Sequence, residues 1–233
     1  MAIEFLYTIV RKPRRRSITL SISPRNHLTV TVPKGFSDSQ IEKFIQQQSR
    51  WIEKKILRNR VLSADYPPKT YQDGDSFSFL GSSYRLEVVE AEQRWVGIKE
   101  DRLRVEASTK EIWGDREESI ASIVQAWYEG MAMQTLKERV GYYEEKMGLK
   151  SKAIRVRTLE AQWGSCAVTG QLCFNSRLVM APMEVVDYVV VHELSHLVYH
   201  NHSPRFWGLV SAFIPDYGKR RKWLREHGQH LQF

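Results

Sequence analysis

The chain has 233 residues, of which 42% are hydrophobic and 27% charged, a balance that is typical of folded globular proteins and excludes disordered or collagen-like chains. Its 35 lysines and arginines outnumber 27 aspartates and glutamates, which gives a formal net charge of +8. The sequence has no apolar run of about 18 residues and no positive-then-apolar N-terminal order, so it predicts neither a membrane-spanning helix nor a secretory signal. With two cysteines it cannot form a disulfide framework. We therefore expect a cytoplasmic protein with no membrane partner.

Residues 1–112 are predicted to form a β-rich N-terminal part crossed by one helix. Apolar residues alternate with polar ones over residues 18–32, which predicts a hairpin. Ser37 and Gln40 match a capping box and predict a helix over residues 38–62. Further alternating positions predict more strands before the end of this part.

Residues 113–233 are predicted to form a second domain that carries the chemistry. Apolar residues at helical spacing predict a long helix from about Glu117 to Gly148. A short strand follows, and then a hairpin whose second strand ends near Val179. Pro182 is well placed as the first residue of a buried helix. The fold class is therefore α+β, with a β-rich N-terminal part and a catalytic part built on an active-site helix.

The buried helix contains the motif His192-Glu193-Leu194-Ser195-His196. Two histidines four residues apart lie on one helix face, so their ring nitrogens can bind one metal ion. Glu193 is rotated by about 100° and can reach a water molecule on that ion, which makes it a candidate general base. The alternative is a pair of structural core histidines. The apolar surroundings favour a metal site, because uncompensated ionisable groups are costly to bury.

A zinc hydrolase usually needs a third protein ligand and a fourth position for water. His202 lies six residues after His196, and Asn201 can leave the helix through a left-handed turn that points His202 back to the metal. His200 continues the helical row, but three ligands on one straight helix would span about 12 Å. Glu226 on the last predicted helix is the alternative. The residues favour His202 as the third ligand of a Zn²⁺ ion.

Further motifs flank the histidines on both sides. Asn201-His202-Ser203 and Phe206-Trp207 follow them, and Trp163-Gly164-Ser165-Cys166 and Phe174-Asn175-Ser176-Arg177-Leu178 precede them. With segments of the N-terminal half at Arg14–Ile22, Val30–Pro33, Trp51-Ile52 and Gly81, these motifs resemble the YgjP-like family of predicted zinc metallopeptidases, which is similar to the SprT and Wss-type proteases.

The resemblance implies a zincin-like fold and a zinc-dependent peptidase acting on proteins or peptides. It also implies that His192, His196 and His202 bind zinc and that Glu193 is the catalytic base. The six-residue offset to His202 is similar to that of metzincins. Those proteins have Gly where this chain has Tyr199, so its turn must form differently.

The hairpin over Trp163–Leu178 is predicted to offer a sheet edge that holds an extended peptide through backbone hydrogen bonds. If Thr169-Gly170 is a two-residue turn, Cys166 lies directly opposite Cys173. The two cysteines are then ordinary packing residues, a redox-sensitive pair or an extra metal site. Packing is favoured, because no CxxC spacing is present.

Basic residues concentrate at the N-terminus, where residues 1–60 hold 13 lysines and arginines against 4 acidic residues. They form either a solvated surface or a surface that binds nucleic acid through phosphates. A second cluster over Lys219–Arg225 is either a solvated helix face or a source of cations near an oxyanion or an acidic substrate.

The predicted function is a zinc-dependent hydrolase, a metallopeptidase in which Glu193 assists the attack of a zinc-bound water on a peptide bond. The alternatives are a metal-dependent nucleotide or phosphate-ester hydrolase, and a nucleic-acid-binding protein with a structural metal.

Overall fold

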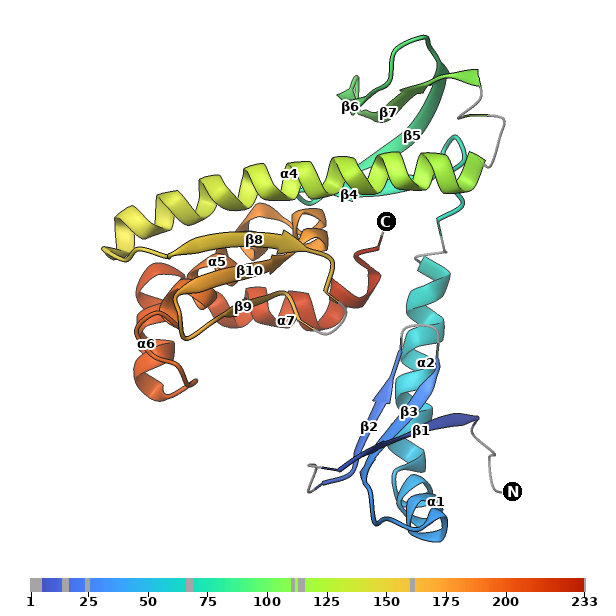
Figure 1. The fold of residues 1–233 in the computed structure, drawn as a ribbon, viewed down its shortest axis with the longest axis vertical. Helices are drawn as coiled ribbons and strands as arrows, with labels where there is room; N and C mark the ends of the chain where they lie inside the picture. The colour runs from blue at the N-terminus through green and yellow to red at the C-terminus, as the bar shows by residue number, and fades with distance from the viewer. Residues whose placement is uncertain are drawn as a thin grey trace. The chain divides into compact units, whose positions relative to one another are not determined.

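The computed structural model describes residues 6–13, 17–23, 26–65, 69–109, 112, 116–159 and 162–232. As predicted, the fold is mixed α+β, with six α-helices and three small sheets among these residues. The chain divides into two compact units, Met1–Pro68 and Lys69–Phe233. Both are drawn in Figure 1. The division into domains 1–112 and 113–233 stays a prediction; the compact units have their boundary earlier in the chain.

The described residues of the first unit form one sheet and two helices. Their bounds are β1 (Tyr7–Lys12), β2 (Thr19–Ile22), β3 (Leu28–Pro33), α1 (Asp38–Gln47) and α2 (Ser49–Asp65). Strand β3 lies in the middle, antiparallel to β2 in the predicted hairpin and parallel to β1. The apolar residues of β3 are buried against those of both helices, and this small core consists of Leu28, Val30, Val32, Ile41, Ile45 and Ile52.

The predicted helix over 38–62 is interrupted once. Ser37 and Gln40 form the predicted capping box at its start. At Gln48 the backbone has φ −98° and ψ 6°, which ends α1 before α2 begins at the next residue. Both helices still bury an apolar face in the core of this unit, which is why one helical period covers both in the sequence.

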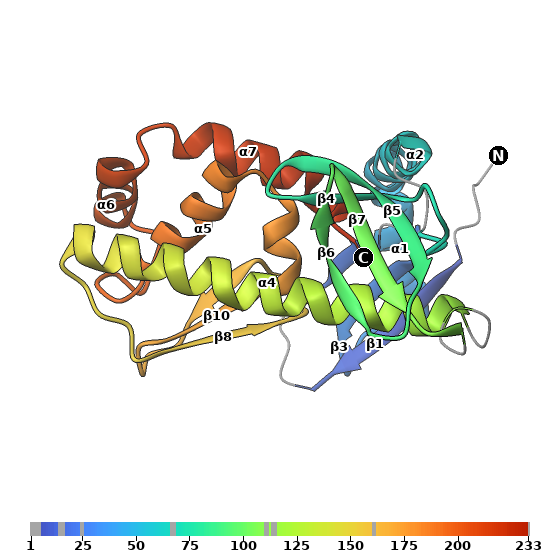
Figure 2. The same cartoon turned by 90° about the horizontal axis from the view of Figure 1, so that it is seen from above.

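The second unit begins with a four-stranded sheet. Its strands are β4 (Ser76–Phe79), β5 (Ser82–Glu90), β6 (Trp95–Lys99) and β7 (Arg102–Ala107), in the order β4-β5-β7-β6. Its buried face shares one hydrophobic core with the long helix α4 (Arg116–Met147), and Figure 2 shows the sheet lying over that helix. Tyr128 of α4 also donates a hydrogen bond of 2.7 Å to the backbone oxygen of Ser78. The sheet is thereby part of the same core as helix α5 (Met183–Ser195).

The remaining elements surround the buried helix α5. They are β8 (Ala153–Arg157), β9 (Gly164–Cys166), β10 (Gln171–Asn175), the 3₁₀-helix η1 (Ser176–Met180), α5 (Met183–Ser195), α6 (Pro204–Phe213), α7 (Tyr217–His227) and η2 (Gly228–His230). The strand order is β8-β10-β9, so β9 is an edge strand. Gly148 ends α4 with φ +64°, as the sequence predicts for a helix stop.

A tight turn between β4 and β5 contacts the start of α5. Leu80 and Gly81 both have positive φ, and the amide of Leu80 donates to the backbone oxygen of Val179 at 2.7 Å. A Cβ atom on Gly81 would lie 3.0 Å from the backbone Cα of Pro182. The close approach therefore needs glycine, and it joins the four-stranded sheet to the chain just before α5.

The structure corrects the predicted hairpin in two respects. The second strand ends at Asn175 and not near Val179, because the Asn175 side chain caps the 3₁₀-helix that follows. The turn holds three residues, with Gly170 at φ +81°. The amide of Ala167 donates to the backbone oxygen of Gln171 at 2.9 Å, and the amide of Gly170 donates to that of Ala167 at 2.8 Å. The register is shifted by one residue relative to a two-residue turn.

The shift decides the positions of the cysteines. Cys166 lies opposite Leu172, and Cys173 lies opposite Ser165. Because a one-residue shift moves a side chain to the other face of a sheet, the two thiols are on opposite faces. Both cysteines are free. The expected direct pairing of Cys166 with Cys173 is therefore wrong.

Within the described part of the chain, no helix is both long and apolar enough to cross a bilayer.

Candidate metal centre and active site

Helix α5 carries His192 and Glu193 and is held in place by its neighbours in the fold. It is buried on most of its surface, and Asp187 at its middle forms a bidentate ion pair with Arg139 of α4, with Nε–Oδ1 and Nη2–Oδ2 distances of 2.6 and 2.9 Å. Such a fork fixes both the position and the rotation of the helix. His192 lies on the last turn of α5, and His196 is its C-cap residue.

The turn after α5 returns His202 to the helix. The ring Nδ1 of His196 lies 2.9 Å from the backbone oxygen of Tyr199. Since a carbonyl oxygen only accepts, Nδ1 carries the proton and Nε2 keeps a free lone pair for a ligand. Ser203 then caps α6, since its side chain accepts a hydrogen bond from the backbone amide of Phe206. The turn thus forms with Tyr199 where metzincins have glycine.

Two aromatic rings of α6 hold the imidazoles in place. Phe206 stacks on the His196 ring at a centroid distance of 4.5 Å, and Trp207 stacks on the His202 ring at 5.5 Å. The sequence motif contained both residues, but nothing in its spacing assigned them this orienting role. Phe206 is fully buried, so α6 is attached to the core directly beside the site.

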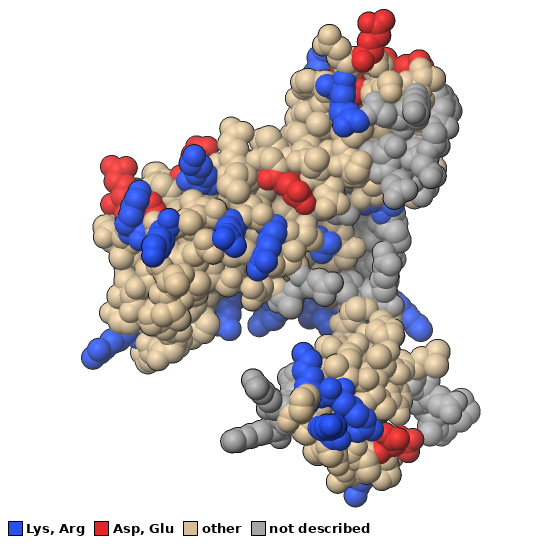
Figure 3. Space-filling model, in the orientation of Figure 1, with Lys and Arg blue, Asp and Glu red and all other residues tan. Residues whose placement is uncertain are grey.

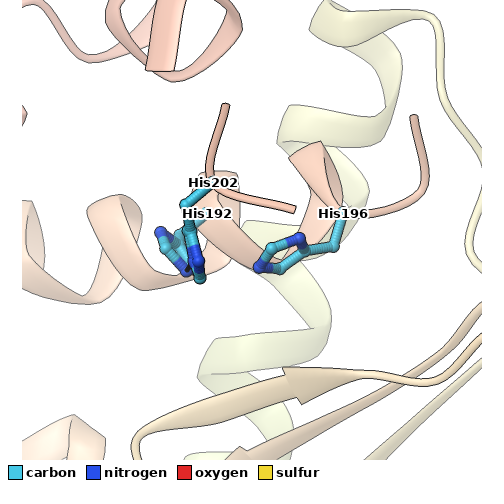
Figure 4. Close-up of side chains that lie close together, drawn as sticks. All are labelled: His192, His196 and His202. Atoms are coloured by element: carbon cyan, nitrogen blue, oxygen red, sulfur yellow. Dashed lines mark hydrogen bonds between the residues drawn. The ribbon is translucent and has the colours of Figure 1, made fainter. Parts of the chain in front are cut away.

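The structure brings the three predicted ligands together. One nitrogen each of His192, His196 and His202 lie within 4.8 Å of one another, and the Nε2 atoms of His192 and His202 are 3.1 Å apart. Figure 4 shows the three side chains close together. Tetrahedral zinc with Zn–N bonds of about 2.0–2.1 Å needs ligand nitrogens about 3.4 Å apart. The donor set therefore fits such an ion. His200 and Glu226 are not part of this cluster.

Burial sets the charge state of the cluster. It lowers the pKa of His192 to about 3, with His196, His202 and Arg221 acting in the same direction. It also lowers the pKa of His196. The imidazoles at these two positions are therefore neutral at pH 7, the form that coordinates a metal.

Glu193 is 5% exposed, and burial raises its pKa to about 8. It faces strand β9, where Gly164 leaves the room for it. A Cβ atom on Gly164 would lie 2.7 Å from both Cγ and Oε1 of Glu193. Gly164 is thus a residue of the site. The sequence analysis named it only as part of a motif, because its contact with Glu193 joins residues 29 positions apart in the chain.

A pocket of about 320 Å³ opens beside Glu193 and His192. Helix α7 forms its far wall. Tyr188, one turn before His192 on α5, also lines it, and burial raises the pKa of that phenol to about 12. Its hydroxyl is therefore a neutral hydrogen-bond donor at the pocket wall.

The sequence as a whole matches the model of one protein family, described as YgjP-like, metallopeptidase domain, over residues 16–227. The chain belongs to the YgjP-like family. It is therefore a metal-dependent peptidase, and the family assignment favours peptide bonds over phosphate esters as its substrates. The site described above is where its histidines and its buried glutamate converge.

Among solved structures, this YgjP-like chain is similar to the crystal structure of the metallopeptidase zymogen of Pyrococcus abyssi abylysin. The identity is 19% and the TM-score 0.36, and the match covers 39% of this chain and 93% of that one. No curated protein matches the sequence.

The predicted basic surface is only partly within the described residues, because Arg14, Arg15 and Arg16 lie outside them. Arg11 contacts the Asp38 carboxylate at 2.5 Å. Exposed basic residues follow on α1 and α2, including Lys43, and Figure 3 shows Lys and Arg side chains on both units. Nucleic-acid binding at the N-terminal part stays a prediction.

Proposed function

We propose that this YgjP-like peptidase is a zinc enzyme in which His192, His196 and His202 hold the ion and Glu193 is the general base. The convergence of three imidazole nitrogens within 4.8 Å carries the proposal. Neutral nitrogen donors suit zinc, whereas Mg²⁺ and Mn²⁺ prefer oxygen ligands. The carboxyl group of Glu193 is the acidic group nearest in sequence to these ligands, and it is buried beside them.

Zinc, when bound, supplies a Lewis acid that lowers the pKa of a coordinated water from 15.7 to about 7 and polarises a carbonyl group. The residues of the chain supply the proton transfers. Burial alone raises the pKa of Glu193, but a cation beside it favours the ionised form. A carboxylate oxygen of Glu193 then accepts the proton of the attacking water and gives it to the leaving amine nitrogen. Gly164 of β9 limits how far this carboxyl can move, since even a Cβ atom on Gly164 would lie 2.7 Å from its Oε1.

The substrate is proposed to lie along β9. This strand pairs with β10 on one side and has its other edge free among the described residues. An extended peptide can add to such an edge through backbone hydrogen bonds. Because Gly164 in β9 touches Glu193, a peptide on this edge passes directly beside the proposed base.

The cytoplasmic location belongs to the same proposal. It is supported by the two free cysteines, which the fold places on opposite faces of a sheet.

A peptide-cleavage assay tests the proposed mechanism. The protein is purified, loaded with zinc and mixed with a library of peptides, and products are identified by mass spectrometry. Glu193→Gln is expected to lower the cleavage rate by about 10²–10⁴-fold while keeping the metal, because only the proton acceptor is lost. Glu184→Gln is the matched control, since Glu184 is exposed on the first turn of the same helix. Full activity in Glu193→Gln contradicts the assignment of the base.

A further inference from the structure

The pocket beside Glu193 has a basic wall. Arg221 and Arg225 line it from α7, and residues four apart on a helix share one face. Its other walls are uncharged or apolar, formed largely by Trp163, Tyr188, Val189 and Leu224. Among the described residues that line the pocket, Glu193 alone is acidic. A ligand in this pocket therefore meets two guanidinium groups on the α7 side, polar groups of α5 on the other, and apolar surface between them.

These two arginines differ from a third on the same helix. Arg220 forms an ion pair with Asp216, with Nε and Oδ1 2.9 Å apart, and donates to the backbone oxygen of Glu184 at 2.8 Å. In the described part of the chain, no salt bridge joins Arg221 or Arg225 to an acidic residue. Arg220 fastens α7 to α5, whereas the two pocket arginines have no carboxylate partner among the residues that the structure describes.

Arg221 is held close to the proposed metal ligands. Its guanidinium carbon lies 5.1 Å from the centre of the Trp207 ring, within the range of a cation–π contact. Trp207 also stacks on the His202 ring. A group that bonds to this guanidinium therefore lies next to the catalytic centre.

We propose that Arg221 and Arg225 bind a carboxylate of the peptide substrate and so set the specificity of the peptidase. A guanidinium fork matches a carboxylate in two parallel hydrogen bonds. The apolar wall at Val189 and Leu224 suits the methylene groups that carry such a carboxylate. Two sources offer this chemistry, the side chain of Asp or Glu and the C-terminal carboxylate of the peptide. The inference rests on the proposed function.

Two sets of peptides distinguish the sources. The first set is built on a neutral peptide with an amidated C-terminus. Each position of this peptide in turn carries either Glu or its isostere Gln, and the two are compared. In the second, a neutral peptide ends in a free carboxylate or an amide. The zinc-loaded protein is expected to show kcat/KM about tenfold higher for the carboxylate member of one set, the ratio that one charged hydrogen-bond pair supplies. A preference in the first set assigns a side-chain carboxylate, and one in the second assigns the C-terminus.

Variants of α7 connect the preference to the arginines. Arg221→Gln and Arg225→Gln are each expected to bring the ratio of kcat/KM for the carboxylate peptide to kcat/KM for the neutral peptide towards one. Arg221→Lys is expected to keep part of the preference for the carboxylate peptide. Lys222→Gln is the matched control, because Lys222 is exposed on the same helix and does not line the pocket. Thermal unfolding of each variant shows that it is folded. A wild-type ratio near one in both sets, or a ratio that persists in both Gln variants, overturns the proposal.

The test separates this inference from the proposed function. If the wild-type protein cleaves no peptide, the same peptides are titrated into the zinc-loaded Glu193→Gln protein and binding is followed by tryptophan fluorescence, for which Trp163 in the pocket wall is a probe. Tighter binding of the carboxylate peptide that is lost in Arg221→Gln then supports the proposed carboxylate pocket, although the peptidase mechanism has failed. Equal affinities for the carboxylate and neutral peptides overturn the proposed pocket.

Discussion

Replacing Gly164 by alanine tests how closely β9 constrains the proposed base. The new Cβ would lie 2.7 Å from Cγ and Oε1 of Glu193, whereas ordinary contacts begin at about 3.4 Å, so the carboxyl group or the strand must move by about 0.7 Å. A displacement of about 1 Å at a reacting group can cost 10²-fold in rate. We therefore expect kcat/KM to fall by about 10–100-fold.

The assay compares peptide cleavage, zinc content and unfolding by urea in the same samples. Overpacking of this kind costs about 1–3 kcal/mol of stability, which leaves the protein folded at room temperature. Zinc content is expected to stay unchanged, because the three histidines are not displaced. Gly208→Ala on α6 is the control, since a Cβ there meets nothing within 4 Å and alanine favours a helix by up to about 1 kcal/mol. A Gly164→Ala protein with wild-type kcat/KM refutes the reasoning.

Two further substitutions test the packing around the site by urea unfolding. Gly81→Ala is expected to destabilise by about 1–3 kcal/mol, because Gly81 has φ +85° and its Cβ would lie 3.0 Å from Pro182 Cα, whereas Gly130→Ala in open space should not destabilise. Burial raises the pKa of Glu144, but hydrogen bonds from the side chain and backbone of Ser151, together with the nearby Lys150, outweigh it, so the net pKa is lowered. A carboxyl group whose pKa is lower in the folded protein than in the unfolded one stabilises the fold at pH values above its unfolded pKa. Glu144→Gln should therefore lower the free energy of unfolding by about 1.5–3 kcal/mol at pH 7. This difference between the variant and the wild type should disappear as the pH falls from about 4.5 through the native pKa. An equal loss at pH 7 and at low pH contradicts that account.

Local patterns predicted most of the elements of this fold. The capping box at Ser37 and the helix stop at Gly148 both depend on neighbouring residues alone, and the structure confirms them. The break at Gln48 and the three-residue turn before Gln171 were not predicted, because both alternatives fit the same local composition. A one-residue change in turn length is enough to move a cysteine side chain to the other face of the sheet.

The site was predictable where it lies on one helix and less so elsewhere. The spacing of His192 and His196 determines that they share a face, and this needs no tertiary information. The approach of His202 depends on a turn, which the structure forms through Tyr199. The contact of Gly164 with Glu193 joins distant segments, so no periodicity in the sequence reveals it.

The most direct test of the account is the zinc content of the purified protein, measured by mass spectrometry after equilibration with zinc and removal of unbound ion. The wild type, Glu193→Gln and the exposed-histidine control His200→Ala are expected to hold about one zinc per chain, whereas His202→Ala should hold much less, because a tetrahedral site loses one of its three protein ligands. Full zinc in His202→Ala together with its loss in Glu226→Gln would contradict the account and move the third ligand to the last helix.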